Sequence, residues 1–413
     1  MSLDKLPRLW GRVSQSLPGL SLVIALMIAT WMTQTVGAEQ PEPDNKPLPI
    51  VTLPEAALQA PAALMPGAMP AAGNSKLDDG LVHAAQREQD ATVDASPFLE
   101  ESSLRIADGL VQTRVIATAG EFTEAQRVIA AAGGLVTYSI ETDSVMQAWL
   151  PLDSLQALAQ EASLAYISAP SYAVELNIDT VAAQTEGFAA LNGQAWRNVG
   201  YDGSGVKIAI IDSSFGGYKN LLGSELPANV TVQNFVDGEN NNDIGSSTSV
   251  HGTACAEIAA DIVPGASFYL IKVSTDLDLA QAVDYAISHG VDVISTSIAW
   301  YNVTPGDGSG YFDNLVKQAR DNGIIWFTAG GNDRENHWGG EFNDPDGDGF
   351  HNFSSTQEVN YYGPGNGGAY QIGPGTLISV FVRWDDWQVT NQDYVLYIGR
   401  WNGSTWEIVG SSD

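Results

Sequence analysis

Two short motifs in the middle of the chain carry side chains that could act together in nucleophilic catalysis. Asp212 ends an apolar run that begins at Val206, and His251 opens the alanine-rich stretch His251-Gly252-Thr253-Ala254-Cys255-Ala256-Glu257. A carboxylate that accepts a hydrogen bond from an imidazole fixes the tautomer of the ring, which can then take the proton of a nucleophile. The residue types therefore predict an orienting acid and a general base, two of the three members of a nucleophilic triad.

The elements that must position these side chains can be inferred from the apolar pattern. The run Val206-Lys207-Ile208-Ala209-Ile210-Ile211, preceded by Gly203-Ser204-Gly205, predicts a buried parallel strand with Asp212 at its carboxyl edge. Open α/β sheets carry their ligands at that edge. Each residue has an ordinary alternative, because strand-end aspartates often cap the next helix and a lone histidine is often structural.

Strands and helices alternate through residues 180–343, which predicts an α/β fold with a doubly wound parallel sheet. Each crossover is long enough to hold a helix, as parallel pairing requires. We expect strands at 206–211, 267–273, 291–297 and 324–328, and helices that begin near His251, Leu277 and Gly310.

Residues 203–212, followed by His251-Gly252-Thr253, resemble the Asp and His motifs of the subtilisin-like serine peptidases, in the family's chain order of Asp, His and Ser. This resemblance assigns the orienting role to Asp212 and the base to His251. Gly330-Gly331-Asn332 resembles the family's Ala-Gly-Asn motif, so Asn332 would donate to the oxyanion of the tetrahedral intermediate. Taken alone, Gly-Gly-Asn is only a turn.

A second part of the resemblance concerns substrate binding. The stretch Val293-Ile294-Ser295-Thr296-Ser297-Ile298-Ala299 resembles the family's strand that lines the cleft. Ser297, Ile298 and Ala299 would then pair with substrate backbone as an added strand, and an ordinary core strand is the alternative. Cys255, the single cysteine, excludes an intrachain disulfide. It is a candidate nucleophile, or a small buried residue in an apolar helical run, which its surroundings favour.

The family's Gly-Thr-Ser motif, which carries the nucleophile, does not occur in the 413 residues. We expect a chain truncated before the catalytic serine, because in relatives with this kind of β-rich insertion the serine follows the insertion. The leading hypothesis is a secreted serine endopeptidase precursor, inactive as this fragment because it lacks the nucleophile. The alternative is a secreted, catalytically inactive subtilase-like protein that acts as a binding or surface module.

The regions outside the core predict a secreted precursor. Lys5, Arg8 and Arg12 precede an apolar run and small residues, the layout of a signal peptide, with an uncleaved anchor as the alternative. Residues 104–176 predict the order βαββαβ of a ferredoxin-like α+β domain. Upstream of a peptidase core this resembles a propeptide, which assists folding and inhibits temporarily; an unrelated small α/β domain is the alternative.

After the core, alternating strands such as 377–384 and 394–398 predict a partial β-sandwich. Asp344, Asp346 and Asp348 stand at alternate positions with Gly349 at the sixth, as in the opening of a calcium loop. Position twelve is Ser355 instead of a glutamate, and a solvated acidic turn is the alternative. We expect no required cofactor, with structural calcium possible at these three aspartates.

The domain prediction is a signal peptide at 1–38, a disordered Pro/Ala-rich linker at 39–103, the propeptide-like domain at 104–176, the incomplete catalytic core at 180–343 and the β-sandwich insertion at 344–413. The formal charge of -31 argues against nucleic acid as a partner and against an anionic membrane once the signal is cleaved. The expected partners are polypeptide substrates and the intramolecular propeptide, and the expected location is extracellular.

Overall fold

The computed structural model of the chain describes residues 21–29, 50–52, 76–89, 104–175, 186–332, 337–355, 357–362, 368–371, 378–385 and 393–412, with backbone only at 21–29 and 50–52. The chain divides into two compact units. One comprises residues 74–339 with 379–383, and the other comprises residues 1–73, 340–378 and 384–413.

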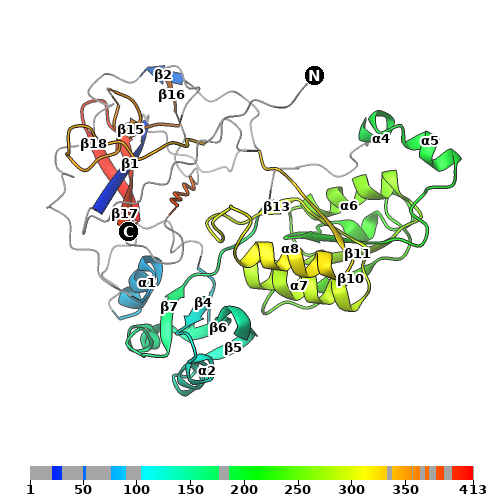
Figure 1. Cartoon of the computed structure of the whole chain (residues 1–413), viewed down its shortest axis with the longest axis horizontal. Coiled ribbons are helices and arrows are strands. Elements are labelled where there is room, and N and C mark those ends of the chain that lie inside the picture. The colour runs from blue at the N-terminus through cyan, green and yellow to red at the C-terminus, as the bar shows by residue number, and fades with distance from the viewer. Residues whose placement is uncertain are drawn as a thin grey trace, which may run out of the picture. The chain divides into compact units, whose positions relative to one another are not determined.

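A five-stranded parallel sheet forms the centre of the first unit (Figure 1). Its order is β10 (Thr231–Asn234), β11 (Ser267–Lys272), β9 (Lys207–Asp212), β12 (Val293–Thr296) and β14 (Ile325–Thr328). Three helices follow its strands: α6 (His251–Ile262), α7 (Asp276–Ser288) and α8 (Tyr311–Asp321). The predicted α/β fold is confirmed. The sequence pattern did not predict β10, a short and polar edge strand.

Alternate side chains of β9 enter two different apolar cores, which explains its uninterrupted apolar sequence. Ala209 and Ile211 belong to the core that includes buried residues of α7 and α8. Ile208 and Ile210 belong to the core that includes Ala256 of α6. Helices therefore cover both faces of the sheet, as a doubly wound sheet requires.

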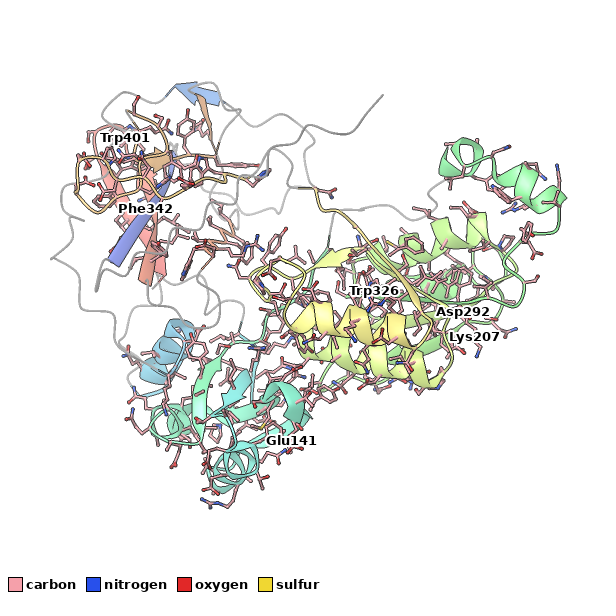
Figure 2. All side chains as sticks on the ribbon, in the orientation of Figure 1. Glu141, Lys207, Asp292, Trp326, Phe342 and Trp401 are labelled. Carbon is pink, nitrogen blue, oxygen red and sulfur yellow. The ribbon has the colours of Figure 1, made fainter. Side chains whose placement is uncertain are left out.

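Polar contacts tie the central strands to their neighbours (Figure 2). At the start of β9, the backbone N–H of Lys207 donates to the Asp292 carboxylate at 2.8 Å. Between the neighbouring strands β14 and β12, the Trp326 indole donates to the Thr296 hydroxyl at 3.0 Å. Two short helices, α4 (Glu186–Ala190) and α5 (Gly193–Asn198), precede β9 in the chain.

The propeptide-like region folds as an antiparallel sheet with helices. Its elements are β3 (Ile106–Ala107), β4 (Leu110–Ala117), α2 (Phe122–Ala131), β5 (Leu135–Ile140), β6 (Val145–Pro151), α3 (Leu155–Leu158) and β7 (Leu164–Ser168). β4 pairs with β6 on one side and with β3 and β7 on the other, while β6 also pairs with β5. The order β7-β4-β6-β5 is that of a ferredoxin-like sheet.

The prediction of a disordered linker at 39–103 is wrong for part of that range. Helix α1 (Asp79–Gln89) packs Leu81, Ala84 and Ala85 into the apolar core of the ferredoxin-like domain. Leu77 joins this core and pairs with Ile167 of β7. The average composition of the segment hides this local apolar stripe, whose burial offsets the cost of ordering the helix. Residues 39–49, 53–75 and 90–103 lie outside the described residues.

The second unit is built from strands. Its sheet has the order β15 (Val359–Asn360), β1 (Ser21–Ala29), β17 (Asp393–Trp401) and β18 (Trp406–Ser412), and β2 (Ile50–Thr52) pairs with β16 (Gly368–Tyr370). The rings of Trp401 (Figure 2) and Trp406 meet edge to face across the β17–β18 hairpin.

One predicted strand falls in this unit, and another is divided between the two units. The predicted strand at 394–398 lies within β17, but the one at 377–384 is wrong over 378–384, which has no strand pairing, and residue 377 lies outside the described residues. The apolar run assigned to the signal peptide supplies β1. The signal peptide at 1–38 and the β-sandwich stay predictions. Among the described residues, no helix combines the length and the apolar character that a membrane span needs.

Candidate active site

Asp212 and His251 meet in the first unit. The His251 Nδ1 lies 2.8 Å from Oδ2 and 3.0 Å from Oδ1 of Asp212. Both side chains are buried, with 0% and 1% of their surface exposed. Asp212 ends β9 and His251 begins α6, so the carboxyl edge of the sheet and the first turn of a helix position the pair.

The residues beside His251 explain how α6 approaches β9 so closely. A Cβ atom at Gly252 would lie 2.6 Å from the Cβ of Asp212 and would also overlap the carbonyl oxygen of Ser214. The N–H of Gly252 donates to that carbonyl at 3.0 Å, and the Thr253 hydroxyl donates to the carbonyl of Gly216 at 2.9 Å. The His-Gly-Thr sequence thus holds the helix start against the turn that follows β9.

The surroundings of Asp212 have opposite effects on the pKa of its carboxyl. Burial raises the pKa of the Asp212 carboxyl, and the hydrogen bond from His251 counteracts that shift. The backbone N–H of Ser213 donates to Oδ1 at 2.9 Å. With Asp212 as acceptor, the proton of the imidazole resides on Nδ1, and Nε2 is the atom that can take a proton from a nucleophile.

Cys255 stands one turn after His251, and its sulfur lies within 4.8 Å of ligand atoms of both Asp212 and His251. Burial raises the pKa of the Cys255 thiol to about 11, and the Asp212 charge adds to the shift. Since the thiolate is the nucleophile, a thiol that stays protonated at neutral pH is poorly suited to attack. Cys255 packs as a partly buried side chain against the core that includes α6.

Beside the dyad, an extended segment of the chain forms backbone hydrogen bonds with two parts of the core. β8 (Val174–Glu175) pairs antiparallel with β13 (Ile298–Ala299), Glu175 opposite Ile298 and Val174 opposite Ala299. On its other side the N–H of Ala173 donates to the carbonyl of Ser274 at 2.7 Å. Two of the three residues predicted to bind substrate backbone, Ile298 and Ala299, thus hold an added strand. Ser297 lies between β12 and β13 and contacts Cys255.

The side chain of Glu175 enters the dyad's surroundings. Its carboxylate accepts hydrogen bonds from the Ser213 hydroxyl at 2.6 Å and from the Ser249 hydroxyl at 2.5 Å. The Ser214 hydroxyl donates to Ser249 at 2.9 Å. Burial raises the pKa of Glu175, but the three serine hydroxyls and the nearby His251 outweigh it and leave the pKa below its ordinary value.

The ferredoxin-like sheet docks on the core through carboxylates. One oxygen of Asp237 accepts from side chains of Gln112, Thr137, Gln147 and Trp149, at 2.9 to 3.2 Å. These four donors lie on three strands of the sheet, β4, β5 and β6.

Three contacts at the start of α7 add to this interface. Arg114 forms an ion pair with buried Asp276 at 3.1 Å. Gln147 donates to Asp278 at 3.1 Å and accepts from the Thr275 hydroxyl at 2.6 Å. Thr275 and Asp278 also form the capping box of α7, so the first turn of this helix serves both as a cap and as a docking surface.

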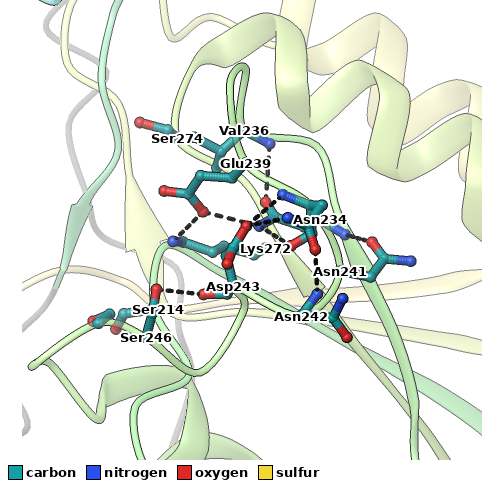
Figure 3. Close-up of polar contacts among 12 residues, drawn as sticks. Ser214, Asn234, Val236, Glu239, Asn241, Asn242, Asp243, Ser246, Lys272 and Ser274 are labelled. Carbon is teal, nitrogen blue, oxygen red and sulfur yellow. Dashed lines mark hydrogen bonds and ion pairs between the residues drawn. The ribbon is translucent and has the colours of Figure 1, made fainter.

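The loop that presents Asp237 is held by a polar network (Figure 3). Asn234, at the end of β10, donates to Glu239 at 2.9 Å and accepts from the N–H of Val236 at 3.0 Å. Lys272, at the end of β11, forms an ion pair with Glu239 at 2.6 Å. Because these contacts bracket residue 237, they fix the carboxylate that faces the docked sheet.

The remaining predicted site residues lie elsewhere. Asn332 is exposed, four residues after the end of β14 and at the same carboxyl edge as Asp212. Asp344, Asp346 and Asp348 lie in the second unit with ligand atoms within 4.8 Å of one another, so they could hold a cation. Asp344 also accepts from the backbone N–H groups of Gly347 and Gly349, which shapes the turn.

Sequence reasoning missed Glu175, Ser249 and Asp237. Ser249 stands two residues before His251, a proximity that could have marked it. A lone glutamate after the ferredoxin-like domain and a lone aspartate in a polar loop carry no comparable signal.

The fold and site together define a class: an α/β protein with a buried Asp–His pair at the carboxyl edge of a parallel sheet, the layout of a triad hydrolase. Residues 203–368 match the model of the subtilase family. Together with the motifs, this match supports a subtilisin-like serine peptidase core in residues 203–368.

Curated relatives agree with that assignment. Subtilisin E of Bacillus subtilis (strain 168) and subtilisin J of Geobacillus stearothermophilus are each 28% identical over 222 residues, which cover 50% of this chain and 54% of theirs. The chain thus spans about half the length of the curated relatives it matches.

Solved structures are similar to this chain over comparable stretches. Fervidolysin from Fervidobacterium pennivorans shares 16% identity at a TM-score of 0.36, over 55% of this chain and 41% of its own. The epidermin leader peptide processing serine protease of Staphylococcus aureus shares 20% identity at a TM-score of 0.39, over 55% and 61%.

Proposed function

We propose that this protein is the precursor of a secreted subtilisin-like serine endopeptidase, whose nucleophilic serine lies outside these 413 residues. The observation that carries the proposal is the buried hydrogen bond between Asp212 and His251, next to a strand that binds extended backbone. Both parts are needed for peptide hydrolysis, since one prepares the base and the other aligns the scissile chain.

In this mechanism Asp212 holds His251 with the proton on Nδ1 and stabilises the imidazolium. His251 Nε2 accepts the proton of the serine hydroxyl as the oxygen attacks the peptide carbonyl, and then donates it to the leaving amine. Asn332 is the proposed donor to the oxyanion. β13 would hold the substrate as an added strand, which binds backbone regardless of most side chains.

The ferredoxin-like domain is the proposed intramolecular inhibitor. Its carboxyl-terminal extension supplies β8, which pairs with β13 where a substrate strand would pair. The contacts of Asp237, Asp276 and Asp278 with the sheet support tight docking of the domain that carries this extension. Activation would then require cleavage after β8 and departure of the domain.

Secretion remains part of the proposal and is supported by the charge and apolar pattern of residues 1–38. Polypeptides are the proposed substrates. The high negative charge argues against nucleic acid. No cofactor is required for the proposed chemistry, and calcium at Asp344, Asp346 and Asp348 would be structural.

The test uses the full-length gene product, including whatever follows Asp413. We expect cleavage of an unstructured protein substrate and covalent labelling by a fluorophosphonate, both abolished by His251→Ala and strongly reduced by Asp212→Asn. His289→Ala is the matched control, because that imidazole lies at the exposed end of α7. A full-length protein that folds and neither cleaves nor labels would instead support a catalytically inactive binding protein.

A further inference from the structure

Strand β8 carries one side chain that the core binds through two separate hydroxyl groups. Glu175 lies opposite Ile298, and its two carboxylate oxygens are bound separately, Oε1 by Ser213 and Oε2 by Ser249. Ser213 follows Asp212 directly, and Ser249 precedes His251 by two residues. The two hydroxyls therefore belong to the same turns that position the dyad, and they form a pocket for the side chain of a bound strand.

The hydroxyls are arranged to donate. The Ser214 hydroxyl donates to the Ser249 hydroxyl, which in turn donates to Glu175. Ser214 and Ser249 therefore form a directed chain of hydrogen bonds that ends on the carboxylate. Such a chain polarises each successive donor and strengthens the last hydrogen bond. All hydrogen bonds that this carboxylate accepts, among the residues the structure describes, come from serine hydroxyls.

The pocket favours an anion although the protein as a whole repels anions. With a formal charge of -31, nonspecific electrostatics would disfavour a glutamate at any surface position. Here the pKa of Glu175 is nevertheless lowered, in part by the nearby His251. The Glu175 charge in turn raises the pKa of Asp212, so the preference for an anion at this position rests on the serine hydroxyls and His251, which outweigh burial.

We infer that the cleft selects polypeptides with glutamate at the residue that pairs with Ile298, and that Ser213 and Ser249 determine this specificity. The inference rests on the proposed function, because β8 is taken to lie as a substrate lies. Glutamine could accept from the same hydroxyls, but hydrogen bonds to a charged acceptor are stronger by roughly a factor of two. Aspartate is one methylene shorter and would reach the two hydroxyls less well.

The experiment uses the full-length protein and fluorogenic peptides of one parent sequence. Each peptide carries Glu, Asp, Gln, Leu or Lys at a single position, and every position on the amino side of the cleaved bond is varied in turn. At one position we expect kcat/KM for Glu to exceed that for Gln by about tenfold or more, with Lys poorest. In the Ser213→Ala, Ser249→Ala double variant the Glu-to-Gln ratio should fall towards one, while Ser224→Ala, an exposed serine elsewhere, should keep it.

The outcomes separate the two proposals. If no peptide is cleaved, the proposed function fails. If peptides are cleaved with equal kcat/KM for Glu and Gln at every position, the function stands and the specificity inference is overturned. A ratio that survives in the double variant would overturn the role of the two hydroxyls, and the wild-type series decides the preference even if that variant does not fold.

A second measurement needs no turnover. In the 413-residue chain, Glu175→Lys should accelerate amide hydrogen exchange in β8 and β13 by about tenfold or more, because the carboxylate contacts hold that pairing. The matched charge reversal Glu141→Lys, in the exposed turn between β5 and β6, should leave this exchange unchanged. Equal exchange in both variants would show that the pocket does not bind the side chain.

Discussion

Replacement of Asp237 should loosen the ferredoxin-like domain from the peptidase core without unfolding either. The Asp237 carboxylate accepts from Gln112, Thr137, Gln147 and Trp149 of the docked sheet. Asp237→Ala removes the acceptor for all four donors. Asp237→Asn keeps one oxygen as an acceptor, removes the charge and replaces the other oxygen with an NH₂ group.

The expected loss of docking free energy follows from the number of hydrogen bonds that one carboxylate oxygen can accept. One carboxylate oxygen has two lone pairs, so four donors share about two strong hydrogen bonds, each contributing about 1.5 kcal/mol in this half-exposed setting. Asp237→Ala should thus weaken docking by about 3 kcal/mol, or roughly a hundredfold in the equilibrium between docked and undocked states. Asp237→Asn should cost about 1 kcal/mol, because a neutral acceptor remains.

Hydrogen exchange detected by mass spectrometry measures this equilibrium in the intact chain. Backbone amides of β8 and β13, which pair only while the domain is docked, should exchange much faster in Asp237→Ala, whereas amides of β9 and β11 should keep their protection. Asp243→Asn changes a carboxylate in the same loop that bonds Asn240 and not the sheet, and it serves as control. If Asp237→Ala leaves β8 and β13 as protected as in the wild type, the docking argument is wrong.

Three further predictions concern separate features. Gly252→Ala should destabilise the core by about 3 kcal/mol or more in urea unfolding, because the new methyl group overlaps the Ser214 carbonyl; a stable variant with full activity would contradict this. Burial raises the pKa of Asp278 to about 6, above its unfolded value, so its contribution to stability is complete below about pH 4 and is lost as pH rises through 6. Asp278→Asn should therefore gain about 3 kcal/mol on the wild type between pH 4 and 8, and a pH-independent difference would refute the shift. Terbium luminescence should report a cation at Asp344 and Asp348 that Asp348→Asn weakens at least about tenfold, and equal titrations would exclude the site.

Much of the core could be predicted because its signals are local. The apolar run that ends at Asp212 appears as β9, and the stretch opened by His251 appears as α6, within a residue of the predicted positions. The period of the apolar residues and the positions of the glycines suffice to predict such elements. The same local reasoning failed for α1, whose apolar stripe was hidden in a segment rich in proline and alanine, and for residues 378–384, whose alternation did not lead to strand pairing.

The sequence by itself determined the parallel sheet, the residues at its carboxyl edge and the Asp–His chemistry, since a strand period and a chain order are properties of neighbouring residues. Only the tertiary structure decided which distant side chains meet. Glu175 reaches Ser213 across 38 positions, and Gln112 reaches Asp237 across 125. A hydrogen bond between groups so far apart in the chain leaves no pattern in either segment, because docking of one folded domain on another brings them together.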